Sequence, residues 1–187
     1  MAKDAFDDLV FGNATPAFSF KLNDTIRGKI TGKATSHRRD LKFDAKAKTY
    51  EQGDLLYWGS DNKPTTDVTD RPVLDPVLTL QTPFKKWEGV PNAPEGDDDG
   101  IRRFFVVARS KANPGSVMDA FKDACRAAKS KVNIGDYVEM RRVGGKGSVT
   151  EPFVHAGDYW PADNPPEWAK DLPADESPEG DADDPFA

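Results

Sequence analysis

The chain has 187 residues, which suits one domain of about 100–150 residues with extensions. Its hydrophobic fraction of 37% and mean hydropathy of -0.69 are low, so we expect part of it to remain unfolded. No apolar run approaches the roughly 18–20 residues that cross a bilayer, and the amino terminus lacks a signal-peptide core, which favours a cytoplasmic protein without membrane contact. Cys125 is the single cysteine, which excludes an intrachain disulfide and a cysteine-built zinc site.

The net charge of -6 conceals an uneven distribution. Residues 161–187 hold nine acids and one lysine, a net charge of -8. Residues 1–160 hold the other 25 basic and 23 acidic residues, which leaves +2. Without the five acids between Glu88 and Gly100 the body would carry +7. A basic body with an acidic tail is suited to a polyanionic ligand.

The first elements in chain order are an arm and a strand. Residues 1–16 are a short acidic arm ahead of the strand-like sequence. Between Thr25 and Thr35, apolar residues alternate with basic ones, which predicts a half-buried strand with one basic face. Glycines at positions 28 and 32 would allow this strand to bend strongly.

The middle of the chain contains further strand-like segments. Residues 36–48 are predicted to be a basic turn and strand edge, and residues 54–59 a short strand that ends at a turn. Residues 73–82 and 101–109 are predicted strands. The Pro-, Gly- and Asp-rich residues 83–100 between them are a predicted loop.

One helix follows, and then two strands. A start signal at residues 113–116 opens the helix, whose apolar face includes Phe121 and Cys125. We therefore expect Cys125 to be a small buried residue. Residues 137–143 and 148–159 are predicted strands joined by a glycine-rich turn.

This order of elements predicts an all-β fold with one helix. A single helix between the third and fourth strands of a small closed sheet is the arrangement of the OB-fold, a five-stranded Greek-key barrel. We therefore expect an OB-fold-like barrel over residues 17–160 and a disordered acidic carboxy-terminal tail over residues 161–187. A β-sandwich would accept the same strands, so that alternative stays open.

Nucleic-acid binding is the chemistry that the body favours. Single-strand binders combine a cationic groove with aromatic faces, on which each stacked base contributes about 1–3 kcal/mol. The chain groups such residues repeatedly along its length. These candidate nucleic-acid-binding residues are Arg38, Arg39, Lys42, Tyr57, Trp58, Lys85, Lys86, Trp87, Arg102, Arg103, Arg109, Arg141, Arg142 and Lys146.

Each candidate also has a plainer interpretation. Basic pairs taken singly are more often solvated surface than ligand contacts. Phe104 and Phe105 are more readily core than stacking surfaces, because alternation turns half of a strand inward. Trp58 and Trp87 border turns and are the better stacking candidates.

Catalysis and metal binding find less support. His37 and His155 lie in different segments without metal-ligand spacing. Asp97, Asp98 and Asp99 cannot all face one ion from a regular strand, so we expect a solvated loop. We therefore expect no enzyme, no cofactor and no metal site, and a metal-dependent nuclease that uses these three acids is the weakest alternative.

The carboxy-terminal tip resembles the acidic, Pro-Phe-terminated tails of bacterial and phage single-stranded-DNA-binding proteins. Body segments at residues 78–82 and 97–103, with Val106, are similar to those of small replication-associated proteins from phages of actinobacteria. The resemblance implies an OB-fold body that coats single-stranded DNA without strong sequence preference in DNA replication, recombination and repair. It also implies that the tail recruits proteins of those processes. The implied partner-binding residues are Asp181, Asp183, Asp184, Pro185 and Phe186.

Two features leave alternatives open. Ala187 follows Phe186, whereas in the cellular proteins the Phe is the final residue and its own carboxylate helps to dock it. The acidity also suits a non-enzymatic protein-interaction module that mimics DNA, although the basic pairs would then lack a role. The tail could also compete with DNA for the basic body, because tethering gives it an effective concentration in the millimolar range. Homo-oligomerisation stays open.

Overall fold

The computed structural model describes residues 17–21, 24–44, 49–68, 71–90, 96–107, 115–146 and 151–173. The predicted arm, Arg109 and the acidic tip from Asp181 to Phe186 lie outside the described residues. In the part of the chain that the structure describes, no helix has the length and apolar character needed to cross a membrane.

Five antiparallel strands form the main sheet. They are β1 (Thr25–His37), β6 (Leu74–Gln81), β7 (Ile101–Phe105), β8 (Tyr137–Gly144) and β9 (Val154–Trp160). Their order in space is β7-β6-β1-β8-β9, and each neighbouring pair is antiparallel. Within the described residues, the prediction of a mostly-β fold with one α-helix is confirmed. The predicted closed OB-fold-like barrel is not confirmed, because no pairing between β7 and β9 closes the sheet among these residues.

Strand β1 joins the two parts of the sheet. Its first residues, Thr25–Lys29, pair with β8, and its later residues, Lys29–His37, pair with β6. A register shift lies between Ile30 and Gly32, within the glycine-containing stretch that predicts a bend. A Cβ at Gly28 would lie 2.5 Å from the carbonyl oxygen of Gln81, so β1 and β6 approach closely only because this residue is glycine.

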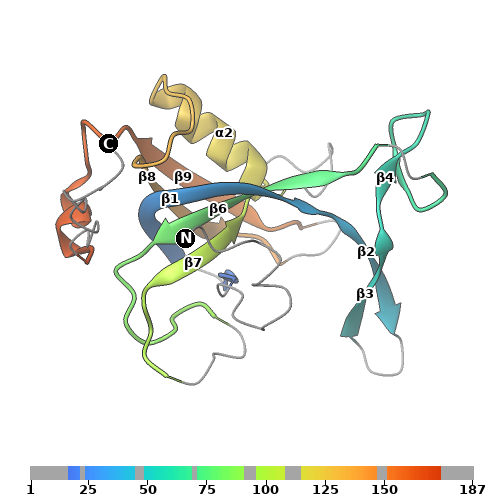
Figure 1. Cartoon of the computed structure of the whole chain (residues 1–187), viewed down its shortest axis with the longest axis horizontal. Coiled ribbons are helices and arrows are strands. Elements are labelled where there is room, and N and C mark those ends of the chain that lie inside the picture. Colours follow the sequence, from blue (N-terminus) through green and yellow to red (C-terminus); the bar gives the residue numbers. More distant parts are fainter. Residues whose placement is uncertain are drawn as a thin grey trace, which may run out of the picture.

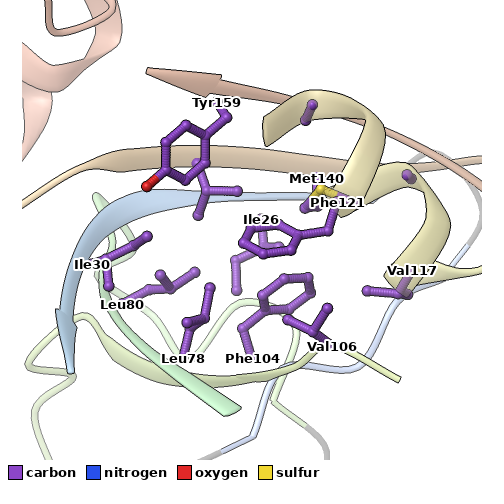
Figure 2. Packing of buried hydrophobic residues seen from close by; sticks show 13 residues of the cluster. Ile26, Ile30, Leu78, Leu80, Phe104, Val106, Val117, Phe121, Met140 and Tyr159 are labelled. Carbon is purple, nitrogen blue, oxygen red and sulfur yellow. The ribbon is translucent and has the colours of Figure 1, made fainter. Parts of the chain in front are cut away.

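Helix α2 (Val117–Ala127) follows β7 in the chain and packs mainly against β9. The Ser116 hydroxyl caps its amino terminus by accepting a hydrogen bond from the Asp119 amide (3.2 Å). Figure 2 shows the ring of Phe121 of α2 inside the core, next to the ring of Phe104. Cys125 is only half-buried, beside this core rather than inside it.

The connection between β1 and β6 contains two hairpins. Strand β2 (Arg39–Asp44) pairs with β3 (Thr49–Leu55), and β4 (Tyr57–Trp58) pairs with β5 (Pro64–Thr65). Figure 1 shows these elements projecting from one end of the main sheet. The turn predicted after residue 59 is confirmed, since β4 and β5 flank it.

The carboxy-terminal part of the described chain corrects one expectation. Residues 161–173, predicted to belong to the disordered tail, contain the 3-10 helix η1 (Glu167–Asp171). They fold against the sheet because Trp168 lies edge-on to the rings of Tyr137 and Trp160. The structure therefore extends the folded body beyond residue 160.

Candidate nucleic-acid interface

The main sheet has one face turned to the core and α2, and a second face that we call the outer face. Side chains alternate between the two along every strand, so adjacent basic residues are separated. On β7, Arg102 is fully buried on the core side, whereas Arg103 is half-buried on the outer face. A basic pair in the sequence is therefore not a basic pair on the surface.

Arg102 forms a buried ion pair with Asp98. Nη1 and Nη2 of Arg102 donate to Oδ1 and Oδ2 of Asp98 at 2.7 and 2.5 Å, and both side chains are 0% exposed. Asp98 also accepts hydrogen bonds from the backbone amides of Trp87 (2.6 Å) and Gly100 (2.9 Å). Burial raises the pKa of Asp98, but the hydrogen bonds from Arg102, Gly100 and Trp87 outweigh it and hold the pKa below its usual value.

This ion pair corrects two expectations. Asp98 is not a solvated loop acid, because its carboxylate is enclosed and satisfied on both oxygens. Arg102 leaves the set of candidate DNA contacts, because a fully buried guanidinium bound to a carboxylate is not accessible to a phosphate. Its role in this structure is to hold the loop that precedes β7.

Trp87 is fixed by the same loop. Its indole N–H donates to the carbonyl of Gly96 (3.1 Å), and the guanidinium of Arg102 lies 5.0 Å from the ring centroid. The backbone of Trp87 has a φ of +54°, and its amide is held by Asp98. The ring is half-buried, and the neighbouring side chains of Lys85 and Lys86 are exposed.

One half of the outer face, which we call the open half, belongs to β6, β7 and the adjoining part of β1. The guanidinium of Arg103 lies 5.9 Å from the ring centroid of Phe105 on the same strand. Thr79 is the cross-strand partner of Arg103, and Gln81 is that of Lys29. Direct partners in an antiparallel pair share a face, so Arg103 lies beside Thr79, and Lys29 lies beside Gln81 on β6 and Tyr137 on β8, at the border with the covered half.

The other half of the outer face, the covered half, belongs to β8, β9 and the beginning of β1. Trp168 of η1 lies over it, with ring centroids 6.0 Å from Tyr137 and 5.9 Å from Trp160. Arg27 places its guanidinium 5.6 Å from the Trp168 centroid and pairs with Asp171 at 3.7 Å. These contacts close this half with aromatic rings and balance its charge.

The remaining candidates on β8 have intramolecular partners. Arg141 pairs with Glu139 (3.3 Å) and Asp158 (3.8 Å) on the covered half. The guanidinium of Arg142 lies 3.5 Å from the ring centroid of Phe153. In the β8–β9 connection, exposed Lys146 pairs with Glu151 (2.9 Å).

The hairpin end of the sheet contains the earliest candidates. Arg38 forms a bidentate pair with buried Asp75, with Nε donating to Oδ2 at 2.8 Å, and this hydrogen bond raises the pKa of Arg38 above its usual value. We assign Arg38 a structural role for that reason. Arg39 and Lys42 are exposed on β2, although Arg39 donates to the Gly53 carbonyl (3.2 Å) and Lys42 pairs with Asp54 (3.3 Å).

The two aromatic candidates at this end differ. Tyr57 is half-buried and packs edge-on against His37, with centroids 4.8 Å apart. Trp58 is 37% exposed on β4, which leaves part of its ring accessible. Lys85, Lys86 and Trp87 lie instead beyond the end of β6, where the register pairs Gln81 with Ile101, so the candidates do not form one cluster.

The structure also brings forward residues that sequence reasoning did not select. Lys29 and Arg27 lie on the outer face, and the alternation along β1 already predicted a basic face there. Trp160 and Trp168 were assigned to the end of the body and to the tail. No local signal shows that they meet, because their contact depends on the path of the chain after β9.

The structure offers no assembled metal site within its described ranges. No group of three or more His, Cys, Asp or Glu side chains in these ranges could hold a metal ion. The ring nitrogens of His37 and His155 lie 2.7 and 3.1 Å from the carbonyls of Leu56 and Gly115. Comparison of the chain with protein-family models, curated proteins and solved structures finds no match.

Proposed function

We propose that the chain binds single-stranded DNA without strong sequence preference on the open half of the outer face. The observation that carries this proposal is the Arg103 guanidinium at 5.9 Å from the Phe105 ring centroid on that surface, with Lys29 on the same face at its border with the covered half. A cation beside an aromatic ring supplies a phosphate contact and a stacking platform together, as single-strand binding requires. Such binding does not need hydrogen-bond donors arranged to read base edges, since an aromatic ring can stack on every base.

The order of the strands supports this choice of surface. In a five-stranded, partly open OB barrel, the face of the second and third strands binds oligonucleotides, together with the loops after the first and fourth strands. Counted within the main sheet, β6 and β7 are the second and third strands. The corresponding loops contain Trp58, Arg39 and Lys42 on one side and Lys146 on the other.

A single strand would follow β7. Exposed Lys85 and Lys86 at one end attract phosphates, Arg103 contacts the backbone at the middle, and a base stacks on Phe105 near the hairpin end. Trp58 offers a second accessible ring on the hairpin. The role in DNA replication, recombination and repair, with partners recruited through the acidic tip, belongs to the same proposal and rests on the tail's resemblance.

The test is fluorescence anisotropy of labelled oligo-dT with the full chain and with Arg103→Ala. Loss of one phosphate contact is expected to weaken binding about three- to tenfold at low salt and to reduce the salt slope by about one. Lys170→Ala is the matched control, because Lys170 is an exposed cation on η1, over the covered half. Equal binding by Arg103→Ala and the native chain would reject this surface.

The DNA-mimic module remains the second candidate, and one observation favours it. Several predicted contacts already pair with acids, including Lys42 with Asp54 and Lys146 with Glu151. Adding oligo-dT separates the two functions. A single-strand binder quenches tryptophan fluorescence, whereas a mimic leaves it unchanged and gives no anisotropy change with single-stranded, double-stranded or RNA oligomers.

A further inference from the structure

A second surface, beside α2, has the character of a docking site. Between α2 and the strands β1 and β6 lies a groove of about 430 Å³. Its apolar lining includes Ala34, Val77, Met118, Cys125 and Val132, with Phe121 at its inner side. Met118, Cys125 and Val132 are only partly buried against the core, so this groove presents apolar surface to solvent.

The groove has a basic rim. Lys33, Lys122 and Arg126 line it together with the apolar residues, and none of the described residues that line it is acidic. The ammonium group of Lys33 donates to the Val132 carbonyl (3.0 Å), which holds this cation at the mouth. An apolar pocket with cations around it favours a ligand that joins a hydrophobic anchor to acidic residues.

We infer that this groove binds the carboxy-terminal tip of the same chain, residues 181–187, with Phe186 as the anchor. Residues 174–187 contain six acids and no basic residue, and Phe186 is their single large apolar side chain. Asp181, Asp183 and Asp184 precede the ring and carry charge opposite to that of the rim, where Arg126 also pairs with Asp123 (2.8 Å). The inference does not depend on where DNA binds.

The length of the tail permits this contact. The described chain ends at Pro173, and 14 residues follow it. Fully extended, they span up to about 46–50 Å, whereas a body of this size has a radius of gyration of about 15 Å. The tether also gives the tip an effective concentration in the millimolar range, so weak affinity suffices for occupancy.

A tip held in this groove is withheld from other proteins. A partner that takes Phe186 would then compete with the body's own groove, and recruitment would require a partner pocket of higher affinity than the internal one. The affinity of the groove for the tip therefore sets the minimum affinity that a partner needs to bind the tip.

Cys125 provides the measurement, because this single cysteine lines the groove. Burial, followed by the charge of Asp136, raises the pKa of its thiol to about 11, so it reacts slowly and its rate reports access. The experiment follows modification of the full chain by an uncharged maleimide at low salt, with mass spectrometry as the readout. Phe186→Ala keeps every charge of the tail and removes only the anchor.

We expect Phe186→Ala to raise the modification rate at least about threefold, and 0.5 M salt to raise the native rate toward that of the variant. Ser177→Ala is the matched tail control and should leave the rate unchanged. Protection should persist on tenfold dilution, because the tip is tethered to its own groove. Equal rates for Phe186→Ala and the native chain, or protection lost on dilution, would overturn the inference.

One control addresses a different occupant. Phe11→Ala removes an apolar side chain from the acidic amino-terminal segment. If Phe11→Ala accelerates modification and Phe186→Ala does not, the groove binds the amino-terminal segment and the inference fails. Methyl NMR of Met118 and Val132 in the same variants gives an independent readout, with shifts expected only for Phe186→Ala.

Discussion

The two halves of the outer face contain the same residue types, arginine and aromatic residues, in different roles. On the open half, the guanidinium of Arg103 lies 5.9 Å from the Phe105 ring centroid, on the face that Lys29 shares. On the covered half, Arg27 and Tyr137 lie under Trp168 of η1. Arginine beside an aromatic ring is therefore a candidate ligand site in one place and a packing contact in the other.

The halves also differ in what stabilises them. The open half lies next to a loop that is held from the core side by the buried Arg102–Asp98 pair. The covered half is held from outside by rings that η1 brings over the sheet. A surface that binds a ligand must stay uncovered, so its support has to come from beneath.

The largest effect is expected from Asp98→Ala. Removing the carboxylate leaves the Arg102 guanidinium buried without its counter-charge, which should lower the free energy of unfolding by about 3–5 kcal/mol. Urea unfolding followed by tryptophan fluorescence measures it. The control is Asp123→Ala, which breaks the exposed pair with Arg126 and should cost less than about 0.5 kcal/mol. Similar losses for both variants would contradict the burial assigned to Arg102.

A smaller effect, on binding rather than folding, is expected from Phe105→Ala. Loss of one stacked base corresponds to about 1–3 kcal/mol, or about 5- to 150-fold weaker binding of oligo-dT. Tyr137→Ala makes the matching change on the covered half and should alter affinity less than twofold. If the two variants lose affinity equally, the division into an open and a covered half does not describe DNA binding.

The smallest effect is expected from Trp168→Ala. It removes the ring that packs on Tyr137 and Trp160, which should lower the free energy of unfolding by about 1–2 kcal/mol. Affinity for oligo-dT should change less than twofold, because the open half is untouched. A marked gain in affinity would show that η1 overlies a binding surface, and that η1 and DNA compete for the covered half.

Local sequence patterns predicted the elements of the sheet well. Alternation over residues 25–35 predicted β1 and its basic face, and the residues around Val117 and Phe121 predicted α2. Both predictions use periods of a few residues, which the sequence displays directly. Phe104 is core as expected, whereas Phe105 is half-buried on the outer face, because alternation allows only one of two neighbours inside.

The candidate site was less accessible to sequence reasoning. Arg38 and Arg102 are each followed by a second arginine in the sequence, which favours a basic surface. In the structure each instead forms an ion pair with an acid that the sequence pattern does not indicate. Asp75 lies 37 residues from Arg38, and Asp98 belongs to an acidic run that favours a solvated loop. These ion pairs form because folding buries the charged groups together, and the amino-acid composition does not show which groups become buried.

By itself the sequence determined that the described part of this chain is mostly β with one α-helix, and that the acids are concentrated in the tail and in the loop before β7. Only the tertiary structure decided which arginines are enclosed, which half of the sheet is covered, and that a basic-rimmed apolar groove lies beside α2. The physical reason is distance along the chain: alternation and charge are local properties. The partner of a side chain is instead set by strands and segments that meet only after folding.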